Sequence, residues 1–163
     1  MAAHQVYLCI GGNLGDRLAN LEETRFFVEC NMGKVLLESS VYESPGWEME
    51  NVPAFLNQII KIETDLTWKD LLSEINELEE FYGKPKRSPE YLSREMDVDI
   101  LFFDDLVINE SDLVVPHPRM NLRRFVLLPL NEVAGDFIHP VENKTVAELL
   151  KICEDTSVIT RLA

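Results

Sequence analysis

The chain is predicted to adopt an α+β fold in which helices pack on a mostly antiparallel sheet. Short apolar runs typical of buried strands alternate with segments of helical periodicity, in the order strand, helix, strand, strand, helix, strand. That order is typical of a split βαβ, ferredoxin-like core. The 163 residues contain no internal repeat or low-complexity linker, which favours one domain over residues 1–163.

The strands are expected where short apolar runs, in part β-branched, are bounded by glycine, proline or polar residues. They cover Val6–Ile10, Val35–Tyr42, Phe55–Leu66 and Met96–Phe103. Glu43–Ala54 and Lys84–Glu95 contain prolines and are expected to be loops. Val107-Ile108 could pair with the fourth strand or with another neighbour. Ser157–Arg161 has a strand-like composition and no assigned place.

The helices are expected from capping residues and from apolar spacing. They run from Asp16 to about Asn31, from Thr67 to Tyr82, around Leu122–Leu130 and from Thr145 to about Cys153. Thr145 and Glu148 have the spacing of a capping box, and Gly33 follows the first helix as a plausible end.

The charge balance restricts the classes of partner. The chain has 29 acidic and 15 basic residues, a formal net charge of -14, which disfavours nucleic acid or an anionic membrane as a general partner. A local phosphate site remains compatible, because charges more than about 8–10 Å apart are largely screened. No signal peptide or membrane-spanning run is evident, and the three cysteines form no Cys-x-x-Cys pair. We expect a cytoplasmic monomer.

The sharpest chemical feature is the pair Asp97 and Asp99. On a strand, residues two apart point to the same face, so both carboxylates project together while Val98 faces the other way. Two acids on one face of an apolar strand are costly unless a cation neutralises them, and Mg²⁺ prefers such oxygen ligands. A solvated strand face, or acids bridged by basic side chains, is an equally weighted alternative.

Basic residues gather in two windows on either side of this strand, which is unusual for so acidic a chain. The windows hold seven of the fifteen basic residues: Lys84, Lys86, Arg87, Arg94, Arg119, Arg123 and Arg124. Lysine and arginine bind phosphate oxygens, so together with a metal site they indicate a nucleoside triphosphate. The alternative is that they decorate loops and offset nearby glutamates.

Two further segments could hold a ligand. Phe55 and Asn57 share a strand face, and an aromatic ring beside an amide suits a flat heterocycle, although core packing is the commoner role. His117 lies between two prolines that could aim its imidazole, yet a lone histidine is more often structural. The Gly11–Asp16 turn lacks the phosphate-binding spacing of a P-loop or a dinucleotide fold.

Taken together and in order, these segments resemble the 6-hydroxymethyl-7,8-dihydropterin pyrophosphokinase family of folate biosynthesis. The likeness runs from about Val6 to Leu150. It is carried by Gly11–Asp16, Ser44-Pro45, Phe55–Asn57, Arg94–Leu101, Pro116-His117 and Arg123–Leu130. The resemblance implies transfer of diphosphate from ATP to the pterin hydroxymethyl group, with AMP as the second product and two Mg²⁺ ions held by Asp97 and Asp99.

The resemblance also implies roles for individual residues. Arg94 is the first choice for a cation that stabilises the transition state, Lys84 is the second, and Asp97 could reduce the need for a base. ATP would meet Asn76, Glu79, Lys84, Lys86, Arg94, Ile100, Val114, His117 and Arg123. The pterin would meet Ser44, Pro45, Trp47, Phe55, Asn57, Tyr91, Asp97 and Phe125, where Tyr91 takes the place of a tryptophan common in the family.

Two other functions remain open at this point. The first is a phosphoryl-transfer enzyme on the same core that sends only the γ-phosphate, which would release ADP instead of AMP. The second is a non-catalytic module that binds a nucleotide or a protein, a reading supported by Glu90 and Glu95, which stand in a window where the family commonly carries basic residues.

Overall fold

The computed structural model describes residues 3–45, 53–83 and 95–162. Its strands are β1 (His4–Gly12), β2 (Lys34–Glu38), β3 (Tyr42–Ser44), β4 (Phe55–Thr64), β5 (Asp97–Phe103), β6 (Ile108–Asn109), β7 (Val114–Val115) and β8 (Thr160–Arg161). Its helices are α1 (Arg17–Asn31), α2 (Trp68–Phe81), α3 (Arg124–Ala134) and α4 (Val146–Ile152), with a short 3-10 helix at Met120–Leu122.

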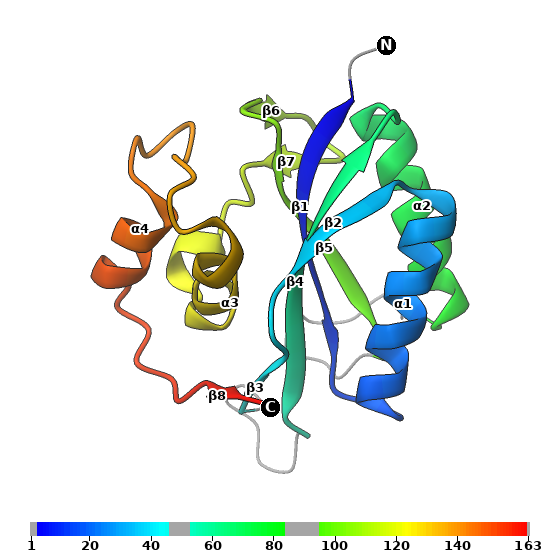
Figure 1. Ribbon diagram of the computed structural model, residues 1–163, viewed down its shortest axis with the longest axis horizontal. Coiled ribbons are helices and arrows are strands. Elements are labelled where there is room, and N and C mark those ends of the chain that lie inside the picture. The colour runs from blue at the N-terminus through cyan, green and yellow to red at the C-terminus, as the bar shows by residue number, and fades with distance from the viewer. Residues whose placement is uncertain (1–2, 46–52, 84–94, 163) are drawn as a thin grey trace.

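The main sheet confirms the predicted α+β fold. Its strand order is β5-β1-β4-β3-β8, β2 also pairs with β4, and every pairing is antiparallel. Because β4 lies between β1 and β2, the β1-α1-β2 unit is the split βαβ expected from the element order. Helices α1 and α2 cover one face of the sheet, and α3 and α4 lie on the other side (Figure 1).

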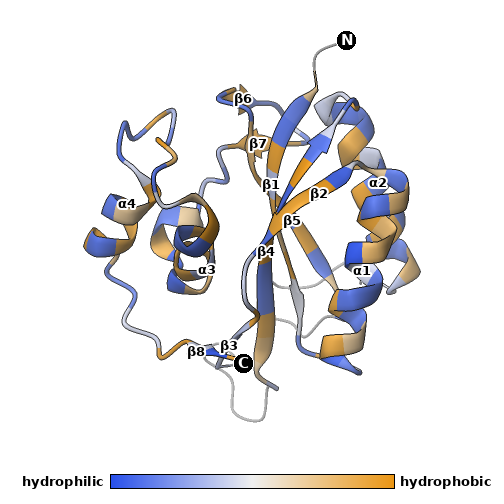
Figure 2. Ribbon diagram, viewed as in Figure 1, coloured by the Kyte–Doolittle hydropathy of each residue, from blue (hydrophilic) through white to orange (hydrophobic). Residues whose placement is uncertain are grey.

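Alternation along the strands builds a core on each face of the sheet. In β1, Val6, Leu8 and Ile10 pack in the core beneath α1 and α2, whereas Tyr7 and Cys9 pack in the core beneath α3 and α4. Figure 2 shows the mixed hydropathy that such two-sided strands carry. One strand therefore serves both layers.

Helix capping places the predicted helices close to their expected bounds. Asp16 accepts a hydrogen bond from the Ala19 amide, and Thr67 accepts one from the Asp70 amide. Thr145 and Glu148 form the complete capping box that their spacing predicts. Each cap satisfies an amide that has no partner inside its helix, and this fixes where the helix begins.

Two expected segments differ from the structure, and the sequence leaves a third open. The strand predicted over 35–42 is divided into β2 and β3 at Ser39, whose amide still donates to the Ile59 carbonyl but whose hydroxyl accepts from the Ile59 amide. The helix expected around 122–130 begins at Arg124 and runs to Ala134, with Leu122 in the preceding 3-10 turn. For Val107-Ile108 the second of the two open pairings is the one observed, because Ile108 pairs with Val115 of β7.

The C-terminal segment, which the sequence left without a place, returns to the main sheet. Its strand β8 pairs with β3 through Tyr42 and Arg161 and through Glu43 and Thr160. Among the described residues, no helix combines the length and apolar character needed to span a membrane.

Candidate active site

The two acids predicted to project together lie near the start of β5, on the sheet face that carries α3. Asp97 is the register partner of Gly11 on β1, and Asp99 is the partner of Cys9. Val98 between them is buried in the opposite core, beneath α1 and α2. The alternation therefore puts both half-buried carboxylates on one face, as the sequence indicates.

The pKa of the Cys9 thiol shows that the acid pair makes this face electrostatically negative. Burial raises the pKa of Cys9 far above its ordinary value, and the negative charges of Asp99 and Asp97 raise it further. The thiol therefore stays protonated, which makes it a poor metal ligand and a poor nucleophile. The donors left at this position are carboxylate oxygens, and a hard cation such as Mg²⁺ suits them.

Asn57 lies on the central strand β4, and β1 separates it from the acids on β5. Its register partner on β1 is Gly11, and its side chain is buried, with Oδ1 4.0 Å from the Cys9 sulfur. A methyl group at Gly11 would overlap Asn57 Oδ1 and the carbonyl oxygen of Leu56. The glycine turn thus has a steric role: it leaves room for the amide that the sequence assigns to a heterocycle.

The other described residues assigned to the pterin lie on neighbouring elements. Ser44 is buried at the end of β3 and pairs with Phe55 at the start of β4, and Pro45 follows Ser44 directly. Phe125 is the second residue of α3. Ser44 and Phe55 thus meet through the sheet ladder, at the end of β4 that also holds Asn57.

A cavity of about 380 Å³ opens beside β5, between α2 and the segment that carries β7. It brings together Asp97 and Asp99 with five of the residues assigned to ATP, which are Asn76, Glu79, Ile100, Val114 and His117. Its wall also includes residues that the sequence analysis did not assign: Leu72, Ile75, Ser111, Asp112, Leu113 and Pro118. The helical spacing of Leu72, Ile75, Asn76 and Glu79 is the signal that could have extended the set.

Glu79 has a structural contact that its predicted role does not include. Its carboxylate is buried and accepts a hydrogen bond of 2.9 Å from the Val98 amide. Since Val98 separates the two aspartates, Glu79 fixes the backbone from which both carboxylates project. The bond also gives a partner to a buried amide that would otherwise be costly to leave unsatisfied.

His117 is held as a neutral ring on the cavity wall. Burial lowers its pKa to about 4, and the charges of Arg123 and Arg119 act in the same direction against the opposing effect of Asp97. The Arg119 amide donates to Nδ1 at 3.2 Å, so Nε2 carries the proton of the neutral ring. At neutral pH the side chain is therefore a hydrogen-bond donor without charge.

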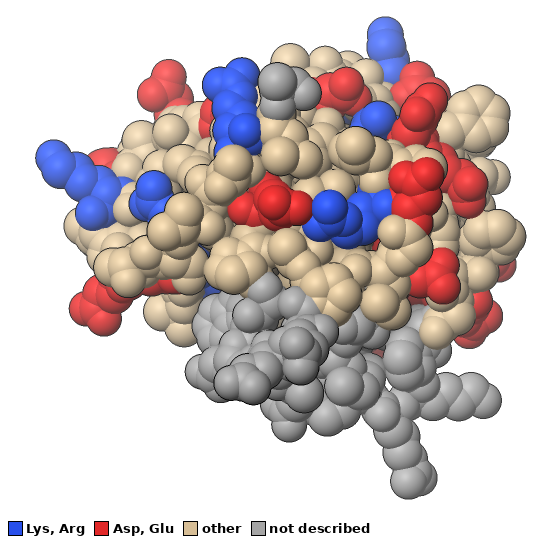
Figure 3. All heavy atoms as spheres, turned by 90° about the horizontal axis from the view of Figure 1, so that it is seen from below, with Lys and Arg blue, Asp and Glu red and all other residues tan. Residues whose placement is uncertain are grey.

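Arg123 is the N-cap residue of α3. Its guanidinium stands 5.6 Å from the ring centroid of Phe125, and its charge lowers the pKa of both His117 and Cys9. It does not line the cavity described above. Figure 3 shows acidic and basic side chains side by side on this end of the molecule.

Five residues given roles in the sequence analysis lie outside the described residues. They are Trp47, Lys84, Lys86, Tyr91 and Arg94. Glu90, which supports the reading as a non-catalytic module, lies outside them as well.

Comparison with known proteins assigns the family. The model of the family described as 7,8-dihydro-6-hydroxymethylpterin-pyrophosphokinase matches residues 7–135. This chain belongs to that family. Its function is accordingly diphosphate transfer from ATP to the hydroxymethyl group of the dihydropterin in folate biosynthesis, as the resemblance implied.

Curated relatives agree with this assignment. The chain is 38% identical over 147 residues to a pyrophosphokinase of Aquifex aeolicus, covering 88% of each chain. It is 33% identical over 138 residues to a Porphyromonas gingivalis pyrophosphokinase, covering 83% of this chain and 93% of that protein. It is 34% identical over 156 residues to the folic acid synthesis protein fol1 of Pneumocystis carinii, covering 94% of this chain but only 20% of that much longer protein.

Solved structures support the fold. Wild-type Plasmodium falciparum HPPK-DHPS with pteroate superposes with a TM-score of 0.76 at 17% identity, covering 92% of this chain and 42% of that chain. A second wild-type structure of Plasmodium falciparum HPPK-DHPS gives a TM-score of 0.75 at 18% identity, covering 92% of this chain and 44% of that chain. The pyrophosphokinase chain thus spans less than half of these neighbours.

Proposed function

We propose that this pyrophosphokinase is Mg²⁺-dependent and joins its two substrates across the end of the sheet where β1 ends and β5 begins. The observation that carries the proposal is the position of Asp97 and Asp99. They line the cavity beside α2, and they share a sheet face with the buried amide of Asn57 on β4. Acids at such a boundary can serve a nucleotide on one side and a heterocycle on the other.

The metal ions would be held by Asp97 and Asp99, and we propose two of them. Both side chains offer hard oxygen donors, and their charges already raise the pKa of the Cys9 thiol, which a bound cation would oppose. When bound, Mg²⁺ neutralises the charge of the phosphate oxygens and polarises the phosphorus that is attacked.

The nucleotide would occupy the cavity beside β5. We assign its contacts to the cavity residues Asn76, Glu79, Ile100, Val114 and His117. The neutral His117 ring donates through Nε2 without adding charge, whereas Arg123 supplies a cation close by. Lys84, Lys86 and Arg94 complete the proposed phosphate contacts, with Arg94 as the first choice for stabilising the transition state.

The pterin would lie against the ends of β3 and β4 and the start of α3. Buried Ser44 and Asn57 provide polar atoms for the edge of the ring, and Phe55 and Phe125 provide aromatic surface. Pro45, Trp47 and Tyr91 complete the proposed set. This division leaves Asp97 nearest the boundary between both substrates.

The reaction forms one bond to phosphorus, breaks another and releases one proton. The hydroxymethyl oxygen of the pterin attacks the β-phosphorus, the bond from that phosphorus to the oxygen bridging the α-phosphate breaks, and AMP departs. We propose that Asp97 accepts the proton of the attacking hydroxyl. The remaining catalysis is positioning and charge stabilisation, which is usual for phosphoryl transfer.

We also propose that the chain acts in the cytoplasm as a monomer built from one domain. Small-molecule substrates require no second chain at the site, and the acidic surface disfavours nucleic acid and anionic membranes. Sedimentation of the purified chain with both substrates would show one species of 18.7 kDa, and a dimer would contradict the proposal.

The deciding experiment separates the nucleotides formed from ATP and 6-hydroxymethyl-7,8-dihydropterin while Mg²⁺ is varied. We expect pterin-dependent AMP that vanishes on addition of EDTA and returns with excess Mg²⁺. Formation of ADP would contradict transfer of the diphosphate. AMP formation that persists in EDTA would contradict the metal requirement alone.

A further inference from the structure

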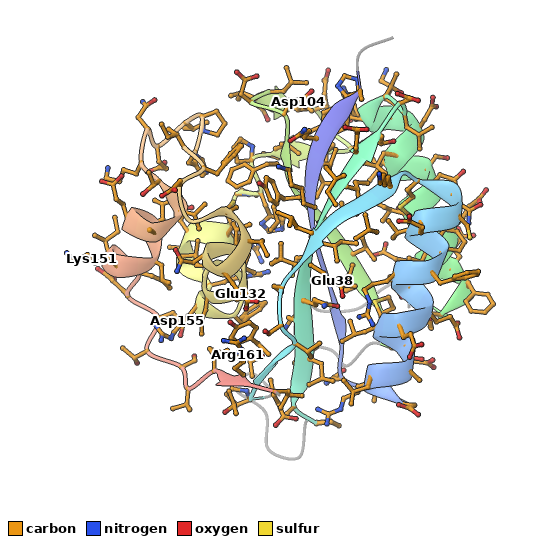
Figure 4. All side chains as sticks on the ribbon, in the orientation of Figure 1. Glu38, Asp104, Glu132, Lys151, Asp155 and Arg161 are labelled. Atoms are coloured by element: carbon orange, nitrogen blue, oxygen red, sulfur yellow. The ribbon has the colours of Figure 1, made fainter. Side chains whose placement is uncertain are left out.

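The segment that follows α4 connects two walls of the proposed pterin site. Asp155 lies against the N-terminus of α3, and β8 a few residues later pairs with β3. Figure 4 shows Asp155 and Arg161 on this segment and Glu132 on α3, where, against the opposing effect of burial, the charge of Arg161 contributes to lowering the pKa of Glu132. The segment lies beyond residues 7–135, the part that the family model matches.

One carboxylate oxygen of Asp155 bonds helix α3, and the other bonds Ser157 in the same segment. Oδ2 accepts from the Arg124 amide at 2.9 Å, and Oδ1 accepts from the amide and the hydroxyl of Ser157 at 2.9 and 2.5 Å. Although burial alone would raise it, the pKa of Asp155 is lowered by these hydrogen bonds. Asp155 is therefore a charged carboxylate, held in one orientation, at physiological pH.

Helix α3 takes this cap from a distant part of the chain. The residue at its own N-cap is Arg123, whose side chain makes no capping hydrogen bond. The first amides of a helix have no partner inside it, and the helix dipole favours a negative charge there. Asp155 supplies both the acceptor and the charge from 31 residues further along the chain.

The capped amide lies between two residues with proposed substrate roles. Arg124 is flanked by Arg123, assigned to ATP, and by Phe125, assigned to the pterin. The same segment reaches the other wall, because the Leu162 amide donates to the Val41 carbonyl at 2.8 Å and Arg161 pairs with Tyr42, two residues before Ser44. One segment thus sets the position of Phe125 relative to Ser44.

Helix α3 is joined to β3 at a second point. Glu132, in its third turn, accepts from the Tyr42 hydroxyl at 2.7 Å and from the Ser40 amide at 2.9 Å. This contact holds the later part of α3, whereas Val126 and Leu127 in the core and the bond from the Arg124 amide to Asp155 hold its first turn. The first turn is where Phe125 lies.

We propose that Asp155 is a positioning residue that places the first turn of α3, and with it Phe125, against the pterin. The inference rests on the proposed role of Phe125 in pterin binding. Asp155 itself does not touch substrate in this assignment. Its loss should weaken pterin binding and leave the nucleotide cavity between α2 and β7 largely intact.

The experiment compares Asp155→Ala with Asp155→Asn and with the matched control Glu154→Ala, at the exposed neighbouring position. Affinity for the pterin is measured with a non-hydrolysable ATP analogue and Mg²⁺ present, and affinity for the analogue is measured alone. We expect Asp155→Ala to weaken pterin binding by about three- to tenfold, the scale of a lost helix cap. Nucleotide affinity should fall less than pterin affinity, because Arg123 adjoins the cap but does not line the cavity.

The Asp155→Asn variant allows the same measurements if Asp155→Ala fails to fold. Its amide oxygen can accept from the Arg124 amide but its nitrogen cannot accept from Ser157, so we expect an intermediate loss. Equal loss of affinity for both ligands, or lower thermal stability with unchanged pterin affinity, would overturn the positioning role.

A double-mutant cycle separates this inference from the role of Phe125. If Asp155 acts through Phe125, then Asp155→Ala should add little once Phe125→Ala is present. If Phe125→Ala alone leaves pterin affinity unchanged, the proposed role of Phe125 fails. Amide exchange then tests the cap directly: Arg124 protection unaffected by Asp155→Ala would overturn the placement of the first turn.

Discussion

The two faces of the main sheet are built from the same strands but serve different purposes. The face beneath α1 and α2 is apolar along the lengths of β1 and β5, from Val6 to Ile10 and from Val98 to Phe103. The opposite face is apolar only under α3 and α4, where Tyr7, Ile59 and Leu101 lie. Beyond that cover it becomes polar, with the acid pair and Asn57.

This difference shows how a small domain combines stability with chemistry. Because side chains alternate along a strand, Asp97 and Asp99 each sit between two residues of the first core. Val98 anchors the strand that presents Asp97 and Asp99, and Leu8 and Ile10 flank Cys9. The covered face keeps the site rigid, and the partly covered face leaves room for substrates.

The largest expected effect comes from neutralising one acid of the polar face. Asp97→Asn should lower kcat by about a thousandfold or more, because the carboxylate binds the metal and acts on the reacting group. Steady-state assays measure kcat, and thermal unfolding of the same preparation shows that the variant is folded.

The matched control is Asp105→Asn, which changes an exposed acid just beyond the other end of β5. It should leave activity within about twofold of the wild type, as surface substitutions usually do. Comparable loss of activity in both variants would contradict the assignment of the site to one end of this strand.

The second effect tests the covered face. Leu8 is fully buried beneath α1 and α2, so Leu8→Ala should destabilise the protein by about 2–5 kcal/mol through lost burial and a cavity. The kcat measured well below the unfolding transition should stay within about twofold, because the folded site is unchanged. Urea unfolding gives the stability, with Leu18→Ala on the exposed surface of α1 as the control.

If Leu8→Ala lowered kcat in proportion to its loss of stability, the distinction between a structural face and a catalytic face would be contradicted. Such a loss would mean that the apolar face tunes the reaction directly instead of holding the strands in place.

The third effect lies where the two strands of the site meet. Gly11→Ala should weaken pterin binding by about tenfold, because the added methyl group displaces Asn57 and presses on the Leu56 carbonyl. Removing the Asn57 side chain as well, in Gly11→Ala/Asn57→Ala, should restore part of the stability and none of the pterin affinity. Pterin titration and thermal unfolding distinguish these outcomes, and unchanged affinity in Gly11→Ala would contradict the steric role.

The smallest effect is a dependence of stability on pH. The pKa of His117 is about 4 in the folded protein and about 6.5 otherwise, so between these values the unfolded chain binds more protons. The contribution of neutral His117 is therefore complete above pH 6.5 and is lost as the pH falls toward 4. In His117→Asn the decline over this window should be shallower, by at most about 1.4 kcal/mol per pH unit.

This measurement uses urea unfolding in buffers without Mg²⁺, so that metal binding does not enter the comparison. Parallel curves for the variant and the wild type across the window would show that the ring is not held in its neutral form by burial.

Much of the fold follows from local patterns in the sequence. The caps at Asp16, Thr67 and Thr145 and the alternation around Val98 determine where elements begin and which way side chains point. The break at Ser39 was not predicted, because it depends on a hydrogen bond to Ile59, a residue of a different strand. Strand β8 was missed for the same reason, since its partner β3 is far away in the chain.

The site was predictable where its chemistry lies on one strand and less so where it is assembled. Asp97 and Asp99 are placed by strand alternation alone, and the family resemblance added residues such as Asn76 and His117 to the cavity wall. Asp112 and Ser111 were missed because nothing local marks them as facing α2. The bond from Glu79 to the Val98 amide likewise depends on helix packing that spacing does not show.

The central claim is that substrates bind at the polar end of the second sheet face, and amide chemical shifts test it most directly. Isotope-labelled protein would be titrated with Mg²⁺, a non-hydrolysable ATP analogue and the pterin. The account predicts that the largest shifts fall on Gly11, Asn57, Asp97 to Asp99, His117 and Arg123 to Phe125. Shifts concentrated on the outer surfaces of α1 and α2, with Asp97 to Asp99 unmoved, would contradict it.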